Sequence, residues 1–208
     1  MTDHNASIAA DRDFFATHFE PLPLMAILRG FDTARTVELS VRAWDVGIRL
    51  VEVPIQSAGA LDALASAVEA GAARARPVGA GTVITVEQVR QAARAGAAFT
   101  VSPGFDREVA EASLAAGCRT CPGRHGERGA ARHGVRPQLA EDVPGLRPRP
   151  RLDRFDAGPL PQAKFVATGG MHLGNTPVYL DAGASGVSLG SALADPHSSR
   201  DCASSPLH

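Results

Sequence analysis

The chain has 208 residues, 44% of them hydrophobic and 21% charged, so it can bury a sizeable core and is neither a disordered tail nor a mini-protein. A formal net charge of -1 provides no general field for binding nucleic acid or an anionic membrane. There is no run of about 18 apolar residues and no basic, apolar leader pattern, which predicts a cytoplasmic protein with no membrane partner. The three cysteines, Cys118, Cys121 and Cys202, make a poor disulfide framework because their number is odd.

Short apolar runs rich in β-branched residues alternate with Ala-rich segments of helical period. The predicted strands are 24–29, 48–54, 77–83, 97–103, 164–170 and 185–191. The predicted helices are 33–46, 59–72, 85–95, 106–116 and 175–182. Continuously apolar strands favour a parallel sheet covered by helices. We therefore predict an α/β fold, a (β/α)8 TIM-type barrel forming one domain over 1–208, with two further strands in 119–160 and an extra helix at 9–19 across its bottom.

The segment 119–154 does not follow this pattern, since it holds nine arginines, five prolines and almost no apolar periodicity. A Pro-rich surface loop is one interpretation, but a loop of this length is uncommon inside a compact barrel. A nucleic-acid-binding arm is another, although the segment has no aromatic residue for stacking and no lysine. The end of the chain, 196–208, also lacks helical periodicity where a final helix is expected.

Polar residues and glycines gather at the predicted strand ends, where the loops of a parallel barrel form its active site. The set comprises Arg29, Glu52, Gln56, Thr82, Ser102, Pro103, Gly169, Gly170, Gly190 and Ser191. Glu52 lies in LVEVP, where burial would raise its pKa and suit it to general acid/base work. A salt bridge to Arg29 is the alternative, and a buried arginine needs such an anion or a substrate carboxylate or phosphate.

Two late glycine motifs, TGG at 168–170 and LGS at 189–191, end consecutive strands. Their bare backbone N–H groups can approach a phosphate closely, at the place where barrels commonly bind one. Tight turns alone are the simpler interpretation.

Three other patterns are weaker. GAGTV at 79–83 lies inside a predicted strand and lacks the third glycine of a nucleotide-binding loop. Cys118 and Cys121 have C-x-x-C spacing with His125 and His133 downstream, but there is no second C-x-x-C, so we predict no metal site. His172 is most simply a solvated loop residue.

An ordered series of motifs resembles the class I aldolases of 2-keto-3-deoxy-6-phosphogluconate and, more closely, 2-dehydro-3-deoxy-6-phosphogalactonate. It comprises PLMAILRG, GIRLVEVPIQS, VGAGTVITVEQV, TVSPGFDREV, AAGCRTCPG, ATGGM and YLDAGASGVSLGSAL, within 23–123 and 157–195. The EVPIQS motif is nearer the EIPLNS pattern of the galactonate branch than the threonine-leucine-arginine run of the gluconate branch.

The resemblance implies a barrel, usually a homotrimer, that cleaves the phosphorylated keto-deoxy sugar acid to pyruvate and glyceraldehyde 3-phosphate without a cofactor or metal. It implies proton transfer by Glu52 and binding of the pyruvate end by Arg29 and Thr82. Gln56 and Pro103 are further candidates for substrate binding. The phosphate-binding residues that it implies are Gly169, Gly170, Gly190 and Ser191.

The family forms a Schiff base on a lysine in a strand that reads roughly LKxFP, nineteen residues after the glycine of CPG, and this chain has no lysine at that position. The only lysine, Lys164, begins a predicted strand and would lie far from the barrel mouth. Read one base out of register, however, codons for Leu139 to Gly145 permit Leu-Leu-Lys-Met-Phe-Pro-Ala, with the lysine at the family's spacing after CPG. We therefore predict that about 124–156 is an out-of-frame translation between two compensating indels, which also explains its arginines and prolines.

Two further interpretations remain open. The first takes the chain as written, as a catalytically dead barrel that still binds phosphate or pyruvate. The second is another phosphate-sugar lyase or isomerase on the same barrel.

Overall fold

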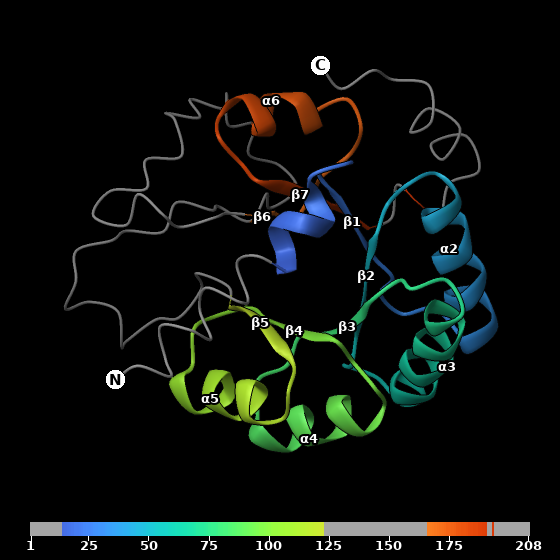
Figure 1. Cartoon of the computed structure of the whole chain (residues 1–208), viewed down its shortest axis with the longest axis vertical. Helices are drawn as coiled ribbons and strands as arrows, with labels where there is room; N and C mark the ends of the chain where they lie inside the picture. The colour runs from blue at the N-terminus through green and yellow to red at the C-terminus, as the bar shows by residue number, and fades with distance from the viewer. Residues whose placement is uncertain (1–13, 123–165, 191–192, 194–208) are drawn as a thin grey trace.

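The computed structural model describes residues 14–122, 166–190 and 193. Within them, seven parallel strands form one curled sheet in the order β5-β4-β3-β2-β1-β7-β6. The strands are β1 (Leu24–Ile27), β2 (Leu50–Pro54), β3 (Val78–Gly81), β4 (Phe99–Ser102), β5 (Arg119–Pro122), β6 (Val166–Ala167) and β7 (Gly186–Leu189). Because β1 pairs with β7, the first and the last of the described strands lie side by side (Figure 1).

The helices connect successive strands and cover one face of the sheet. They are α2 (Thr33–Asp45), α3 (Ala60–Ala72), α4 (Val86–Arg94), α5 (Arg107–Ala115) and α6 (Thr176–Asp181). Figure 1 shows α2 to α5 along the outside of the curl and α6 beside β6 and β7. None of the described helices is long and apolar enough to cross a membrane.

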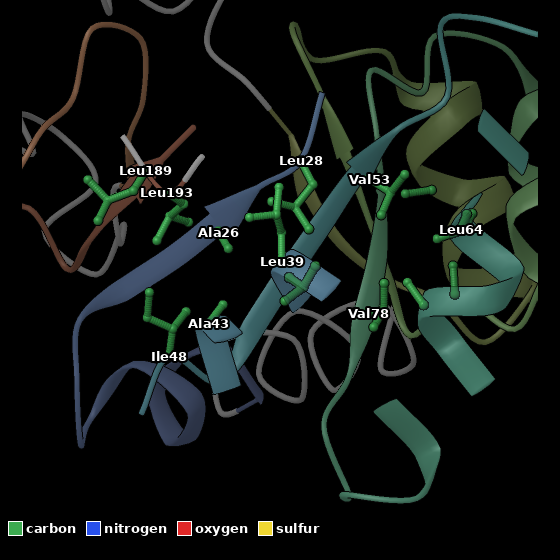
Figure 2. Close-up of a cluster of buried hydrophobic side chains, with 14 of the residues drawn as sticks. Ala26, Leu28, Leu39, Ala43, Ile48, Val53, Leu64, Val78, Leu189 and Leu193 are labelled. Carbon is green, nitrogen blue, oxygen red and sulfur yellow. The ribbon is translucent and has the colours of Figure 1, made fainter. Parts of the chain in front are cut away.

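The outer face of the sheet packs against the helices through a continuous apolar layer. Val51 and Val53 of β2 are buried in it together with Leu39 of α2 and Leu64 of α3 (Figure 2). Alternate residues of β1 and β7 join the same layer, because side chains of a strand alternate between its two faces.

The inner face has a second, smaller cluster at the bottom of the curl. Met25, Leu50 and Phe99 point inward from three strands and meet Phe19, from the helical residues 14–19. The ring of Phe99 also contacts Phe15 edge-on, with 5.5 Å between ring centroids. This cluster fills the inside of the curl at the end where the strands begin.

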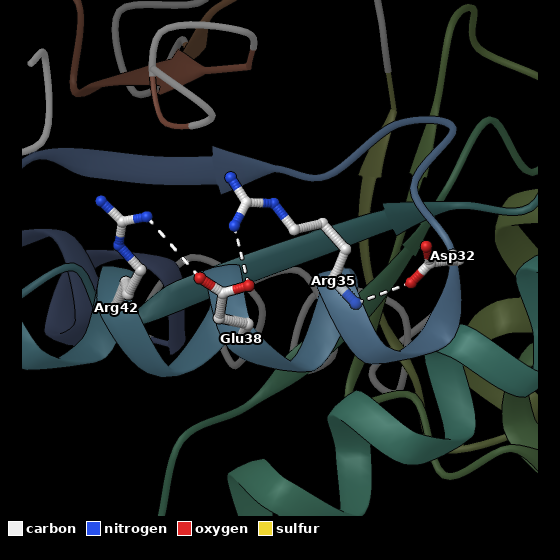
Figure 3. Close-up of polar contacts among 4 residues, drawn as sticks. All are labelled: Asp32, Arg35, Glu38 and Arg42. Atoms are coloured by element: carbon white, nitrogen blue, oxygen red, sulfur yellow. Dashed lines mark hydrogen bonds and ion pairs between the residues drawn. The ribbon is translucent and has the colours of Figure 1, made fainter. Parts of the chain in front are cut away.

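Side-chain caps mark where the outer helices begin. Asp32 Oδ1 accepts a hydrogen bond of 2.8 Å from the backbone N–H of Arg35, which satisfies a free donor in the first turn of α2 (Figure 3). Glu38 then pairs with Arg35 at 2.7 Å and with Arg42 at 3.8 Å along the exposed side of the helix. Thr85 and Asp106 cap α4 and α5 in the same way.

The predicted α/β fold is confirmed, and every predicted strand and helix within the described residues has its counterpart, each of them shorter than predicted by one to three residues at one end or both. Of the two strands predicted in 119–160, β5 is the first, while the place of the second lies outside the described residues. The helix predicted at 9–19 is helical over 14–19, and residues 9–13 fall outside the described part.

Candidate active site

The predicted site residues lie at one edge of the sheet, because the carboxyl ends of parallel strands point the same way. Ile27 of β1 is in register with Glu52 of β2, and Pro54 with Gly81 of β3. On the other side, Ala26 is in register with Leu189 of β7. The residues that follow these strands therefore lie together at the carboxyl end of the sheet, which we call the opening.

Glu52 lies on the inner face of β2 and is 3% exposed. Its Oε2 is buried without a hydrogen-bond partner. Burial disfavours the charged form and raises the pKa of the carboxyl from an ordinary 4.5 to about 7, although the positive charge of Arg29 opposes this rise. Glu52 can therefore accept or give up a proton near neutral pH.

Arg29 follows β1 and is exposed at the opening. Its Nη1 donates a hydrogen bond to Oε1 of Gln56, which follows β2. The ion pair with Glu52 that the sequence left open is not among those of the described residues, so the guanidinium acts on that carboxyl only through its charge. The donors of Arg29 that do not face Gln56 can meet an anionic ligand.

Thr82 and Pro103 flank the opening beyond β3 and β4. Thr82 has a left-handed backbone, with φ of 58°, which is rare for a β-branched residue and costs conformational energy. This turn lies between two ladder bonds, from Ile55 N to the Gly81 carbonyl at 3.0 Å and from Val83 N to the Val101 carbonyl at 3.0 Å. Pro103 is exposed.

The glycines of the TGG and LGS motifs follow β6 and β7, the two strands that come after β1 in the order of the sheet. Gly169 and Gly170 follow β6 with φ of +86° and +63°, and both are exposed. The space around Gly169 is open, with no atom within 4 Å of the position that a Cβ would take. Gly190 follows β7 and is half-buried, and its partner in the LGS motif, Ser191, lies outside the described residues.

Sequence reasoning missed Asn175, which holds the TGG loop in shape. Its Oδ1 accepts a hydrogen bond of 2.9 Å from the backbone N–H of His172, and its Nδ2 donates one of 3.1 Å to the Gly170 carbonyl. An asparagine at the first position of the helix predicted at 175–182 was the only available signal. His172 itself is exposed, as expected of a loop residue.

Sequence reasoning also missed the roles of two glycines in β3. Both lie on the inner face, where Gly79 makes room for the ring of Phe99 and Gly81 makes room for the Glu52 side chain. The sequence predicts that the GAG run is not a nucleotide-binding loop, and the structure places it within strand β3. Its alternate glycines beside a strand carrying an inward glutamate were the available signal.

The two cysteines of the C-x-x-C motif differ in their burial. Cys118 is buried, its thiol donates to the Ala97 carbonyl at 3.3 Å, and burial raises its pKa. Cys121 is half-buried on β5. His125 and His133, like Lys164 and Glu141, lie outside the described residues.

Together these residues make a chemically asymmetric opening. A buried acid/base group lies within reach of the charge of Arg29, and the glycines of the TGG and LGS motifs follow strands on the other side of β1 from it. This arrangement suits proton transfer on a small molecule with an anionic group at each end.

Comparison of the sequence with known proteins finds a matching family and several relatives. The family described as "KDPG and KHG aldolase" matches residues 17–128. The 2-dehydro-3-deoxy-6-phosphogalactonate aldolase of Escherichia coli is 32% identical over 83% of this chain and 84% of its own. The 2-dehydro-3-deoxy-phosphogluconate aldolase of Treponema pallidum is 38% identical over 64% of each chain.

Comparison with solved structures also finds aldolases of this kind. A native KDPGal structure superimposes with a TM-score of 0.64 at 28% identity, over 88% of this chain and 90% of that one. The fold is also that of KDPG aldolase from Legionella pneumophila, captured with pyruvate as a covalent carbinolamine, with a TM-score of 0.68 at 23% identity over 93% and 97% of the chains. By its sequence matches and its fold, this chain belongs to the KDPG and KHG aldolase family.

Proposed function

We propose that this protein cleaves 2-dehydro-3-deoxy-6-phosphogalactonate, or its gluconate epimer, to pyruvate and glyceraldehyde 3-phosphate. The observation that carries the proposal is the state of Glu52 at the opening. Its carboxyl is buried, its Oε2 has no hydrogen-bond partner, and its pKa is raised to about 7. A group with that pKa is present in both protonation states at neutral pH, as a proton shuttle requires.

In the proposed reaction a lysine attacks the C2 ketone and forms a protonated imine after loss of water. Glu52 supplies and removes protons during that dehydration and during cleavage of the carbon–carbon bond. The imine stores the electron pair released by cleavage as an enamine. Protonation of the enamine and hydrolysis then release pyruvate.

Substrate binding divides between the two sides of the opening. We assign the pyruvate end to Arg29 and Thr82, with Gln56 and Pro103 beside them. A carboxylate suits the guanidinium, since charge-assisted bonds of this kind are strong. The phosphate is assigned to Gly169, Gly170, Gly190 and Ser191.

The required lysine is absent from the chain as written, and we propose that the out-of-frame segment 124–156 conceals it. The match to the family ends at residue 128, shortly after that segment begins, which is consistent with a change of frame there. In the shifted frame the lysine is encoded across Glu141 and Asp142. Resequencing tests this directly, because an unbroken frame without indels relative to close relatives would exclude it.

Borohydride trapping with pyruvate tests the function. We expect no covalent adduct with the chain as written and a stable reduced adduct, detected by mass spectrometry, after the frame is restored. Failure to trap pyruvate in the restored chain would refute the aldolase proposal. It would leave the second candidate, a barrel that binds phosphate or pyruvate without turnover.

The substrate epimer and the assembly are finer proposals. EVPIQS favours the galactonate branch, and so does the long match to the Escherichia coli galactonate enzyme. We propose a homotrimer that acts in the cytoplasm within galactonate degradation. Comparing kcat/KM for the two epimers tests the substrate, and sedimentation equilibrium tests the trimer.

A further inference from the structure

We propose that Gly81 is a positioning residue, whose missing side chain provides the seat for the proton-transferring carboxyl of Glu52. The inference rests on the proposed function of Glu52. Gly81 is the last residue of β3 and is buried. A Cβ built on it would overlap Oε1 of Glu52 and would lie 2.7 Å from its Cδ and 2.9 Å from its Cγ.

The register shows which way the carboxyl is directed. On β3 the residue level with Glu52 is Gly79, and Gly81 is level with Pro54, two residues nearer the opening. The Glu52 side chain therefore leans along the strands toward the opening and lies over Gly81. A larger residue at 81 would force the carboxyl away from β3.

Backbone conformation does not explain this glycine. Gly81 is not among the residues with positive φ, so any L-residue can adopt its backbone. What the position requires is space for the carboxyl. The same contact shields Oε1 from water on the β3 side and so contributes to the burial of Glu52.

Gly79 offers a matched control on the same strand and face. It is buried and also lies outside the positive-φ region, but a Cβ there would overlap the ring of Phe99 at the bottom of the sheet. Gly79→Ala and Gly81→Ala therefore add the same methyl group to the same interior. Only the second methyl meets the carboxyl.

A double-mutant cycle on the full chain tests the contact without substrate. We expect Gly81→Ala to lower the urea midpoint in the Glu52 background and to have little effect in a Glu52→Ala background, because the clashing group is then gone. Gly79→Ala should lower the midpoint equally in both. Equal losses from Gly81→Ala in the two backgrounds would overturn the proposal. If Gly81→Ala alone does not fold, recovery of folding by Glu52→Ala supports it, and failure to recover overturns it.

Proton exchange at C3 of pyruvate, followed by NMR in the frame-restored chain, tests the positioning role. We expect Gly81→Ala to lower kcat at least roughly tenfold, to leave KM for pyruvate within about twofold and to move the pH midpoint downward as the carboxyl becomes solvated. Gly79→Ala should leave the midpoint in place. An unchanged kcat and midpoint in Gly81→Ala would refute positioning. Absence of exchange in the restored chain without substitutions would instead refute the proposed function. The double-mutant cycle would still show whether Gly81 and Glu52 are in contact.

Discussion

The two faces of strand β2 carry side chains of opposite character. On the outer face, Val51 and Val53 are buried among the apolar side chains of α2 and α3. On the inner face, between them in sequence, Glu52 is equally buried but leaves Oε2 without a partner. One strand thus carries stabilising contacts on one side and a costly buried acid on the other.

This difference teaches where the fold can tolerate an unfavourable group. Burying a carboxyl with an unpaired oxygen destabilises a protein unless the group becomes neutral. The apolar layer of the outer face offsets that cost, since each fully buried aliphatic side chain contributes about 1.5 to 3 kcal/mol. We therefore expect substitutions on the outer face to change stability and substitutions on the inner face to change chemistry.

The largest expected effect is that of Glu52→Gln on turnover. Glutamine keeps the shape of the side chain but cannot transfer the proton, so we expect kcat to fall about 10²- to 10⁴-fold in the frame-restored chain. Steady-state cleavage of the galactonate substrate measures it. Loss of less than about fivefold would assign the proton transfer to another group.

Leu64→Ala tests the outer face. Leu64 is 0% exposed within the layer between α3 and the sheet (Figure 2), so its truncation should cost about 2 to 5 kcal/mol of unfolding free energy. Urea denaturation measures this, with Val178→Ala as the control because Val178 is 47% exposed. A pH profile of turnover that moved with Leu64→Ala would contradict the separation of the two faces.

The pH dependence of stability isolates the cost of the inner face. Because folding raises the pKa of Glu52 from 4.5 to about 7, its stabilising contribution is complete below pH 4.5 and is lost as the pH rises to about 7. The loss amounts to about 3 kcal/mol. Urea midpoints between pH 4 and 8 measure it, and Glu52→Gln should remove this component. An identical pH dependence in the variant would show that Glu52 is not the group responsible.

Much of the outer face could be predicted from the sequence. Predominantly apolar runs such as 48–54 predicted strands buried on both faces, and helical periodicity predicted the segments that cover them. Glu52 was identifiable for the same reason, because a single carboxylate within an apolar strand has no solvent to reach. Arg29 and the late glycines followed from their places at strand ends.

The contacts on the inner face could not be predicted from the sequence. That Gly81 lies beneath the Glu52 carboxyl depends on the register between β2 and β3, which no local pattern specifies. The bond from Arg29 to Gln56 joins residues 27 apart, and that from Asn175 to Gly170 depends on a turn with two positive-φ glycines. Contacts of this kind arise from packing between elements, so propensity and periodicity within one element cannot reveal them.

The smallest effect that we predict concerns the beginning of α2. Asp32→Ala removes the side-chain acceptor of the Arg35 N–H and should cost about 1 kcal/mol of unfolding free energy (Figure 3). Asp32→Asn is the matched control, since asparagine caps helices about as well. Asp32 lies three residues after Arg29, so this variant also tests whether destabilising the first turn of α2 changes the chemistry at the opening. We expect lower thermal stability with an unchanged pH midpoint of turnover, because the pairing of β2 with β1 and β3 holds the backbone of Glu52 in place. A moved midpoint would mean that the two faces are coupled through the loop between β1 and α2.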